Sequence, residues 1–366
     1  MKKNCLFNVL FVWGIVTLNA QVTAPFVVDF EQHNTGPYTM SMARQDFPPP
    51  GDWYYGMDQG RGEIMNENGN KVLRVKYPRG CVGVNDPGAC GIQIKWKLPE
   101  PAKTMWLSYR IKFEEGFEFV KGGKLPGLCG GKCYTGGKTP GCGDGWSARI
   151  MWRTGGKVVQ YMYFIDQAAT YGDDMKWDEG GAQRQFIPGR WHTVLTQVVL
   201  NDVPVGASQG LKNGIVRSWF DGELAMEVDT LRLVDFADQK IDLFYISTFY
   251  GGSDSSWAPS KDNYIRYDDF WISSTPPSGF RTSRNLDSPT GMREENLIIQ
   301  SNPSVNELNI QTDKGIIQVE IVNLMGASVI KSSENVVNVD GLKKGIYLIY
   351  VKFKDGTYAT RKFVKS

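Results

Sequence analysis

Short stretches in which apolar and polar residues alternate recur along the chain from residue 24 to residue 273. They read PFVVDF, KVLRVKY, GIQIKWKL, MWLSYRIKF, WSARIMWR, KVVQYMYFID, RWHTVLTQVVLN, GIVRSWFDG, IDLFYISTFY and NYIRYDDFWIS. A period of two residues is typical of β-strands that bury one face, and no comparable helical period accompanies it. We therefore predict an all-β fold in which these strands form an antiparallel two-sheet sandwich or jelly roll.

A second group of strand patterns follows a change in composition. Residues 275–294 are rich in Ser, Pro, Thr and Gly, which is typical of a linker. Residues 295–366 then contain NLIIQSNPSVNELNIQ, IIQVEIVNLMGASVIKS and KKGIYLIYVKFKDGTYATRKFVKS, with a hairpin turn at Lys354-Asp355-Gly356. This pattern predicts a small C-terminal β-sandwich, separated by the linker from a large domain over residues 21–274.

The N-terminus has the three parts of a secretory signal peptide. Lys2 and Lys3 precede an apolar stretch from Leu6 to Leu18, and Ala20 is a small residue at the expected cleavage site. We assign residues 1–20 to this peptide, which is too short to favour a membrane span. No later stretch is long and apolar enough to cross a bilayer. We therefore expect an exported protein without a membrane-spanning segment.

The composition is that of an ordinary globular protein. The 366 residues are 41% hydrophobic and 12% aromatic and carry a formal net charge of +2. A charge so close to neutral argues against a general nucleic-acid binder, so any basic function must be local. We expect a monomer.

Removal of the signal peptide leaves five of the six cysteines. In an exported protein we expect them to pair, and Cys81 with Cys90 would close a short Pro/Gly loop. Two of Cys129, Cys133 and Cys142 would tie the Gly-rich segment 129–145 together. A metal site made of these three is the alternative, but no nearby His completes it. We therefore expect no metal and no other cofactor.

The stretch KGGKLPGL, from Lys121 to Leu128, places two lysines among glycines. It resembles a phosphate-binding loop, but that motif requires a Gly five residues before the Gly-Lys pair. Glu118 occupies this position before Gly123-Lys124. The sequence therefore predicts a glycine-rich loop whose lysines bind another anion.

Residues 146–164, WSARIMWRTGGKVVQYMYF, predict a hairpin around Gly155-Gly156. Alternation places Ser147, Arg149, Met151 and Arg153 on one face of the first strand, and Tyr161 and Tyr163 share a face of the second. A two-residue turn would set Arg149 opposite Met162. A three-residue turn would set Arg149 opposite Tyr161 and Ser147 opposite Tyr163, which gives one polar face. A functional groove requires the three-residue turn.

Lys, Arg and paired Tyr residues on one sheet face suit the eliminative cleavage of a polyuronate. Arginine and lysine neutralise the substrate carboxylate, so that the neighbouring C–H becomes acidic. A tyrosine can act as the base or the acid if nearby cations lower its pKa from about 10. None of these steps demands a metal.

The motifs that carry a family resemblance are YRIKFEEGFEFVKGGKLPGL, WSARIMWR, YMYF, PGRWHTV, WFDGE and STFYGGSDSSWAPSKDNYIRYDDFWIS. Together they resemble polysaccharide lyase family 14, which includes alginate and glucuronan lyases with a β-jelly-roll fold. The resemblance covers residues 24–274. It implies functional roles for Lys124, Ser147, Arg149, Tyr161 and Tyr163. Lys124 and Arg149 would hold the uronate carboxylate, and Tyr163, with Tyr161 or Ser147, would transfer protons.

The C-terminal unit carries Ser301-Asn302-Pro303, VEIVNLMG, GLKKGIYLIYV and the ending RKFVKS. These resemble the C-terminal sorting domain of the type IX secretion system of Bacteroidetes. The resemblance implies the type IX secretion machinery as a partner and transport across the outer membrane, followed by release or surface attachment. A generic β-sandwich or binding module is the alternative.

Four further residues are candidates for substrate binding: Lys121, Arg153, Tyr250 and Trp257. His192, in GRWHTV, fits the structural start of a strand better than a catalytic role. A glycoside hydrolase is a rival function, but its two carboxylates on one strand, as Glu-x-Asp-x-x-Glu, do not occur here. A non-catalytic carbohydrate-binding module is a second rival, and it leaves the Ser-Arg-Tyr-Tyr arrangement unexplained. We expect a secreted lyase acting on an acidic polysaccharide, with mannuronate-rich alginate as the leading substrate and β-linked glucuronan as the alternative.

Overall fold

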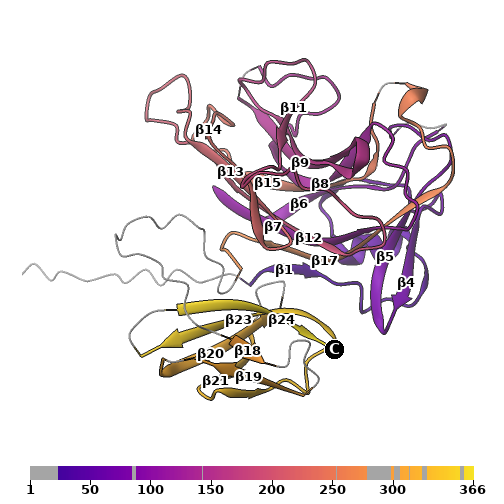
Figure 1. Ribbon diagram of the computed structural model, residues 1–366. Coiled ribbons are helices and arrows are strands. Elements are labelled where there is room, and N and C mark those ends of the chain that lie inside the picture. The colour runs from indigo at the N-terminus through magenta and orange to yellow at the C-terminus, as the bar shows by residue number, and fades with distance from the viewer. Residues whose placement is uncertain are drawn as a thin grey trace, which may run out of the picture.

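The computed structural model describes residues 24–84, 88–141, 143–252, 254–277, 298–300, 306–312, 314–323, 328–354 and 358–366 (Figure 1). The expected signal peptide, most of the expected linker, Cys142 and the predicted turn residues Asp355 and Gly356 lie outside these residues. Within the described ranges, no helix is long and apolar enough to cross a membrane.

The first layer of the large unit is an eight-stranded antiparallel sheet in the order β11-β10-β9-β8-β15-β6-β3, with β16 paired to β8. Its strands are β3 (Gly51–Tyr55), β6 (Gln93–Ala102), β8 (Gly122–Gly131), β9 (Gly145–Arg153), β10 (Val158–Tyr163), β11 (Asp173–Lys176), β15 (Ile241–Ser247) and β16 (Phe249–Tyr250).

The second layer is a nine-stranded sheet in the order β14-β13-β12-β7-β17-β5-β4-β2, with β1 paired to β17. Its strands are β1 (Phe26–Val28), β2 (Gly36–Pro37), β4 (Gly62–Glu67), β5 (Asn70–Tyr77), β7 (Thr104–Phe113), β12 (His192–Val199), β13 (Gly214–Phe220), β14 (Glu223–Leu231) and β17 (Asn263–Ser273).

The hydrophobic core lies between these two sheets, because most of their strands are apolar on one face. On β6, for example, Ile94 and Trp96 enter the core, whereas Lys95 and Lys97 point to the opposite face. Complete burial of such a large side chain stabilises the fold by about 1.5–3 kcal/mol. The predicted all-β jelly roll is therefore confirmed, and its eight-stranded sheet presents one face away from the core.

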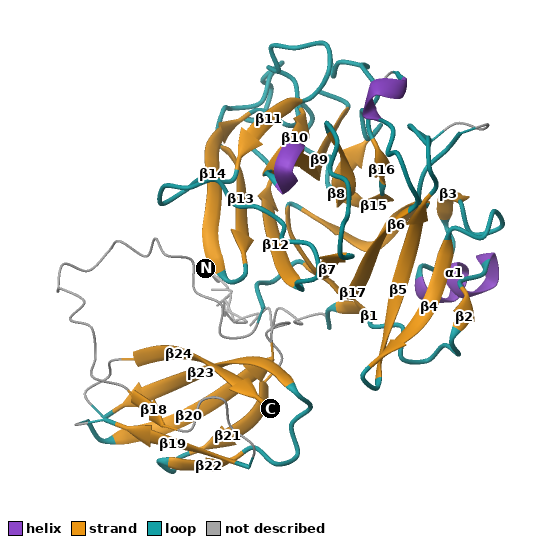
Figure 2. Cartoon of the chain, turned by 45° about the vertical axis from the view of Figure 1, so that its right-hand side comes forward, coloured by secondary structure: helices purple, strands orange, loops and turns teal. Residues whose placement is uncertain are grey.

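Helices are few and short in the described part of the chain (Figure 2). The one α-helix, α1 (Met40–Asp46), begins at Thr39, whose side chain accepts a hydrogen bond from the amide of Met42. Two 3-10 turns follow, η1 (Thr154–Gly156) and η2 (Ser255–Trp257). Both lie in connections beside the eight-stranded sheet, next to β9 and β16.

The C-terminal unit, drawn from orange to yellow in Figure 1, has its own two antiparallel sheets in the orders β18-β19-β22 and β21-β20-β23-β24. Its strands are β18 (Ile298–Gln300), β19 (Glu307–Gln311), β20 (Ile316–Asn323), β21 (Ser328–Ser332), β22 (Val336–Asn338), β23 (Gly345–Phe353) and β24 (Tyr358–Lys365). A separate core that includes Ile321, Ile349 and Phe363 joins the sheets. The predicted small β-sandwich is confirmed.

Candidate active site

The hairpin between β9 and β10 has the three-residue connection that a polar face requires. The amide of Arg153 donates to the carbonyl of Lys157 at 2.7 Å. Gly155 and Gly156 adopt φ angles of 71° and 79°, which favour glycine. Arg149 consequently lies opposite Tyr161 and Ser147 opposite Tyr163. The prediction of a shared face is confirmed, and the two-residue turn is excluded.

The KGGKLPGL stretch is not a loop, which corrects the sequence-based expectation. Residues from Gly122 onward form β8, which lies between β9 and β15. A side chain at Gly127 would overlap the carbonyl oxygen of Ala148, so this glycine allows close backbone contact within a sheet. The ladder to β9 is irregular between Lys124 and Gly127, and Pro126 occupies this irregularity. The bulge brings Lys124 and Gly127 to the same side of the sheet.

The strand registers align one residue from each strand across the outer face of the eight-stranded sheet, the face turned away from the core. We call this set the transverse row; from one edge to the other it consists of Trp53, Lys95, Tyr245, Gly127, Arg149, Tyr161 and Asp174. Lys124 lies beside the row, opposite Met151 on β9 and Phe249 on β16. The row therefore brings together residues that are far apart in the sequence.

Lys124 is partly buried among aromatic rings and other cations. Its ammonium nitrogen lies 4.7 Å from the ring centroid of Tyr161 and 5.8 Å from that of Phe249. Burial, together with the positive charges of Arg149 and Arg153, lowers the pKa of Lys124 to about 7. An amine with this pKa can accept a proton at neutral pH.

Arg149 is almost completely buried, at 2% exposure. One guanidinium nitrogen donates to the Ser247 hydroxyl at 3.0 Å, whereas its buried Nε has no hydrogen-bond partner in the structure. Within the described ranges, no carboxylate lies within ion-pair distance of Arg149 or Lys124. A buried charge without an opposite charge beside it is energetically costly. An anion that reached these two cations would relieve this cost and would form charge-assisted hydrogen bonds with them.

The hydroxyls of Tyr161 and Tyr163 each accept a hydrogen bond from a loop amide. Gly172 donates to Tyr161 at 3.2 Å, and Gly137 donates to Tyr163 at 3.0 Å. The two rings meet edge to face, with centroids 5.6 Å apart. Burial, and then the interaction with Tyr163, raises the pKa of Tyr161. Tyr161 therefore keeps its proton at neutral pH and can donate it.

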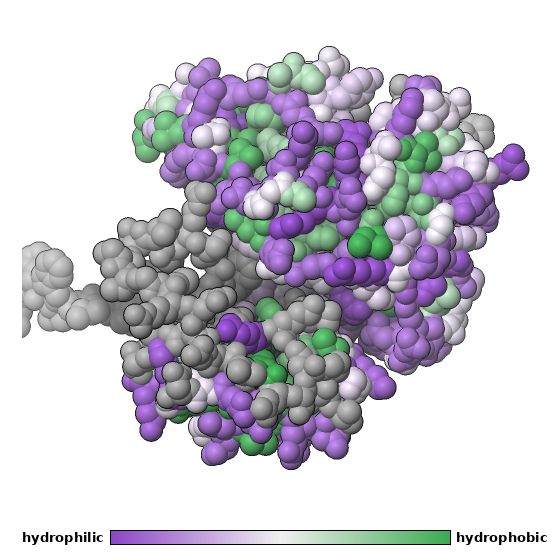
Figure 3. Space-filling view, in the orientation of Figure 1, coloured by the Kyte–Doolittle hydropathy of each residue, from purple (hydrophilic) through white to green (hydrophobic). Residues whose placement is uncertain are grey.

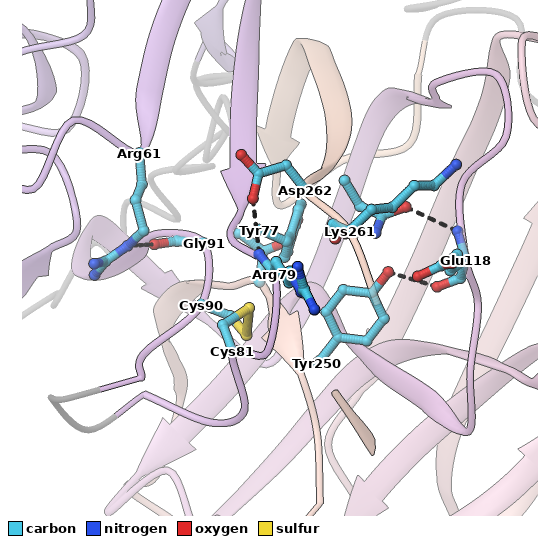
Figure 4. The surroundings of a disulfide bond; sticks show 12 residues. Arg61, Tyr77, Arg79, Cys81, Cys90, Gly91, Glu118, Tyr250, Lys261 and Asp262 are labelled. Atoms are coloured by element: carbon cyan, nitrogen blue, oxygen red, sulfur yellow. Dashed lines mark hydrogen bonds between the residues drawn. A yellow bond between two sulfur atoms is a disulfide. The ribbon is translucent and has the colours of Figure 1, made fainter. Parts of the chain in front are cut away.

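Ser147 is fully buried, and its hydroxyl donates to the carbonyl of Tyr134 at 2.7 Å. Tyr134 belongs to the cysteine-containing insert, which also supplies the amide of Gly137. A disulfide joins Cys129 to Cys133 at the base of this insert, and another joins Cys81 to Cys90 (Figure 4). The second pairing is the predicted one. Two of the three remaining cysteines pair as expected, while Cys142 lies outside the described residues.

The four additional candidates have different surroundings. Arg153 is held by two hydrogen bonds to Asp174, of 2.8 Å and 2.6 Å. Trp257 lies next to it, with the Arg153 guanidinium 5.9 Å from its ring centroid. Lys121 is exposed and donates to the Ser256 hydroxyl at 2.6 Å. These three surround one end of the row.

Tyr250, by contrast, faces the core between the sheets. It is 0% exposed, and its ring meets that of Trp152 edge to face at 5.4 Å. Its hydroxyl points to Glu118 and donates to the carbonyl of that residue (Figure 4). We therefore correct the expectation that Tyr250 contacts substrate, because a sugar cannot reach its ring.

The two histidines are structural, as the sequence favoured for His192. Its Nδ1 lies 2.9 Å from a carboxylate oxygen of Asp221, and its Nε2 accepts from the amide of Ile187. His33 is buried against Asp46 at 2.8 Å. Neither residue belongs to the transverse row.

The sequence reasoning missed several residues of this face, among them Tyr245, Ser247, Lys95 and Asp174. Alternation within IDLFYIS places Tyr245 and Ser247 on one face, but it does not reveal that β15 lies beside β8. Asp174 belongs to the short strand DDMK, which has no apolar pattern. Only the strand order brings these side chains to Arg149.

A face with a neutralising arginine, a lysine of near-neutral pKa and two hydrogen-bonded tyrosines can hold a carboxylate and transfer protons. That is the chemistry of an enzyme acting on an acidic sugar polymer on an all-β scaffold. The model of the family described as polysaccharide lyase 14 matches residues 65–270, and that of the secretion system C-terminal sorting domain matches residues 301–366. The chain therefore belongs to polysaccharide lyase family 14. It is a polysaccharide lyase exported by the type IX secretion system to the cell surface or the extracellular space.

Solved structures share the fold of the large unit. Alginate lyase Aly36B is 23% identical, with a TM-score of 0.56, and the match covers 69% of this chain and 97% of that one. The marine PL-14 alginate lyase from Aplysia kurodai is 24% identical, with a TM-score of 0.56 and coverage of 69% and 100%. Alginate lyase vAL-1 from Chlorella virus is 19% identical, with a TM-score of 0.51 and coverage of 58% and 88%. No curated protein matches the sequence.

Proposed function

We propose that this lyase cleaves alginate, with a preference for mannuronate-rich stretches, by β-elimination, and that it acts as a monomer. Two observations on related structures support the substrate class. Solved structures that share the fold include alginate lyases, and variants of Aly36B were solved with alginate trisaccharide and tetrasaccharide. The preference for mannuronate-rich stretches is the expectation stated for the sequence, and the assay below decides it.

The observation that carries the proposal is the pair of cations beside Tyr161. Arg149 and Lys124 lie within reach of one ring, with the Arg149 guanidinium 5.7 Å and the Lys124 ammonium nitrogen 4.7 Å from its centroid. In the described part of the chain, neither has an acidic partner within ion-pair distance. A polyuronate carries one carboxylate per sugar and supplies the missing charge.

In this mechanism Arg149 binds the carboxylate of the sugar that loses its proton. Its guanidinium neutralises the charge, so the electrons left by proton removal can be accommodated on the carboxylate group. The hydrogen bond to Ser247 fixes the orientation of the guanidinium. Because the site is buried, the electrostatic interaction is stronger than it would be in water.

Lys124 is the base, which revises the sequence-based expectation that it binds the carboxylate together with Arg149. With a pKa of about 7, a large fraction of its amine is neutral at neutral pH. It removes the proton from the carbon that bears the carboxylate. The electron pair of that C–H bond forms a carbon–carbon double bond, and the bond from the adjacent carbon to the glycosidic oxygen breaks.

Tyr161 is the acid that gives its proton to the departing oxygen. The amide of Gly172 then stabilises the phenolate through its hydrogen bond. The ammonium of Lys124 lies next to this ring, so a proton transfer from Lys124 to Tyr161 restores both groups. Tyr163 and Ser147, which are held by the insert, position Tyr161 and Arg149.

The proposal is tested with the full exported chain on polymannuronate, polyguluronate and glucuronan. The ultraviolet absorbance of the unsaturated product and the number of new reducing ends are measured in parallel. We expect both signals to rise, most strongly on polymannuronate, and to fall at least 100-fold in Lys124→Ala and Tyr161→Phe. Lys103→Ala, in the exposed turn between β6 and β7, is the matched control.

Each alternative function gives a different result. New reducing ends without absorbance would indicate hydrolysis and overturn the elimination mechanism. Absorbance on glucuronan alone would replace the substrate and keep the mechanism. Retardation of the polymers in a gel with neither signal would indicate a non-catalytic binding protein.

A further inference from the structure

The transverse row continues beyond Arg149 in the direction of β3. From Arg149 on β9, the registers lead across Gly127 on β8 to Tyr245 on β15, Lys95 on β6 and Trp53 on β3. Directly paired residues project to the same side of a sheet. These three residues therefore share the outer face with Arg149, although none belongs to the catalytic group described above.

Their side chains form an aromatic surface with a cation beside it. The rings of Trp53 and Tyr245 lie 6.2 Å apart at an angle of 40°, and Tyr55 lies 6.3 Å from Trp53. The Lys95 ammonium nitrogen is 5.4 Å from the ring centroid of Tyr245. Trp53 and Lys95 are partly exposed, whereas Tyr245 is 4% exposed.

This chemistry matches a uronate unit. An aromatic ring packs against the apolar C–H face of a sugar, and an ammonium group attracts a carboxylate. The rings are also held in place, because Trp53 and Tyr245 pack in one cluster with Leu243 and the Cys129–Cys133 disulfide. A surface that is already ordered binds with a smaller loss of conformational entropy.

The position in the row separates this surface from the reacting sugar. Strands lie about 4.8 Å apart, so the three steps from β9 to β6 separate the backbones of Lys95 and Arg149 by roughly 14 Å. Their charged groups lie closer together, because both approach the Tyr245 ring: the Arg149 guanidinium is 5.7 Å and the Lys95 ammonium nitrogen 5.4 Å from its centroid. Gly127 lies between the two residues and adds no side chain of its own to this part of the face. A chain that crosses the strands would thus meet both cations with different units.

We propose that Trp53, Lys95 and Tyr245 form a second uronate-binding subsite, which holds another sugar of the polymer whose reacting unit is bound through its carboxylate by Arg149. This inference rests on the proposed function for its ligand, an acidic polysaccharide. It predicts that the subsite strengthens the binding of long chains and leaves the chemical step unchanged.

The experiment compares Lys95→Ala, Trp53→Ala and Trp53→Phe with the wild type and with Lys103→Ala. The substrates are the long polymer and the shortest oligouronate that the wild type cleaves. We expect Lys95→Ala and Trp53→Ala to raise KM for the polymer by roughly tenfold, with kcat and the kinetics on the short substrate unchanged. Trp53→Phe keeps a ring and should lie between the wild type and Trp53→Ala.

The outcomes separate the subsite from the proposed function. An equal change on long and short substrates, or no change on either, would overturn the subsite. If the wild type forms no unsaturated product, the proposed function fails. The subsite is then tested by the retardation of the uncleaved polymer in a gel. Binding of the polymer by the wild type but not by Lys95→Ala would still support the subsite. Should Trp53→Ala fail to fold by circular dichroism, Lys95→Ala and Trp53→Phe provide the same comparison.

Discussion

Both large sheets carry a line of cations across the outer face, and the two lines differ in their partners. On the nine-stranded sheet, Arg74, Arg266 and Lys112 are aligned by register. Glu114 lies 2.8 Å from both arginines, and Glu67 lies 2.6 Å from Lys112. On the eight-stranded sheet, Arg149 and Lys124 have no such carboxylate among the described residues.

The difference is visible in the proton affinities. Burial alone would lower the pKa of Arg74 and of Arg266, but the hydrogen bonds and the negative charge of Glu114 outweigh burial, so the pKa of both arginines is raised. On the other sheet, burial and neighbouring cations lower the pKa of Lys124 to about 7. The same residue types therefore stabilise the fold where acids neutralise them, and remain available for an anionic ligand where acids are absent. Hydrophilic residues dominate the visible surface of the large unit (Figure 3). The kind of residue at the surface therefore does not distinguish cations paired with acids from cations available to a ligand.

The largest expected effect comes from removing one arginine from each line. Arg149→Met should lower kcat/KM by about 10²–10³-fold, because the carboxylate loses its charge-assisted hydrogen bonds. Arg266→Met should leave kcat/KM unchanged and lower the free energy of unfolding, because Glu67 and Glu114 each lose a partner. Initial rates and urea unfolding measure both quantities.

Equal losses of activity in Arg149→Met and Arg266→Met would show that the cations of the two sheets do not differ in function. Arg149→Lys sharpens the test, because it keeps a charge but loses the planar geometry. We expect it to recover only part of the rate.

A second test asks whether the insert places the tyrosines. The double variant Cys129→Ser/Cys133→Ser removes the disulfide at the base of the insert. In the insert, the amide of Gly137 donates a hydrogen bond to Tyr163, and the carbonyl of Tyr134 accepts one from Ser147. We expect kcat on the shortest substrate to fall by about ten- to a hundredfold, because small displacements at a reacting centre are costly. Steady-state kinetics well below the melting temperature measure it.

Cys81→Ser/Cys90→Ser is the matched control, since this disulfide closes a loop beside Tyr250 in the core (Figure 4). Its loss should reduce stability but leave kcat within about twofold. The proposed role of the insert fails if both double variants lose activity to the same degree.

The pH dependence of the rate tests the state of Lys124. If the neutral amine is the base, kcat/KM rises with pH as Lys124 loses its proton around pH 7. The increase between pH 6 and pH 8 should be about tenfold. In Arg153→Gln, one of the cations that lower this pKa is absent, so the midpoint should shift to higher pH. A flat profile between pH 6 and pH 8 would remove Lys124 from the role of base.

The sequence predicted the parts of this molecule that depend on local pattern. Alternation predicted the strands and reduced the register of Arg149 and Tyr161 to two turn lengths. Two glycines suit either turn, so the shared face of these residues was decided by the observed register. The pairing of Cys81 with Cys90 followed from their short separation.

What failed depended on contacts between distant segments. The glycines of β8 allow close backbone packing against β9, and in the sequence they are indistinguishable from turn glycines. Tyr250 lies on a strand of two residues, too short for alternation to show which face is buried. The transverse row requires the strand order β10-β9-β8-β15-β6-β3, in which β15 and β6 are separated by more than a hundred residues.

The smallest expected effects are opposite changes in stability on the two sheets. Lys124→Met should raise the free energy of unfolding by about 1–3 kcal/mol at pH 6, because it removes a poorly solvated charge. The folded-state pKa of Lys124, about 7, lies below its usual 10.5, so the unfolded chain binds more protons between these values. Wild-type stability therefore rises with pH across this window, and the advantage of the variant is largest below pH 7.

Glu114→Gln should instead lower the free energy of unfolding by about 1–2 kcal/mol at neutral pH. Burial alone would raise the pKa of Glu114, but hydrogen bonds from Arg74 and Arg266 outweigh burial and lower this pKa below its usual 4.5. The stability that Glu114 contributes is present above this value and is lost as the pH falls below it, so the two proteins should converge in acid. Urea unfolding of the wild type and both variants at pH 4, 6 and 9 measures the two trends. If Lys124→Met destabilises the protein at pH 6, Lys124 contributes to the fold as Arg266 does, and the distinction between the two faces is lost.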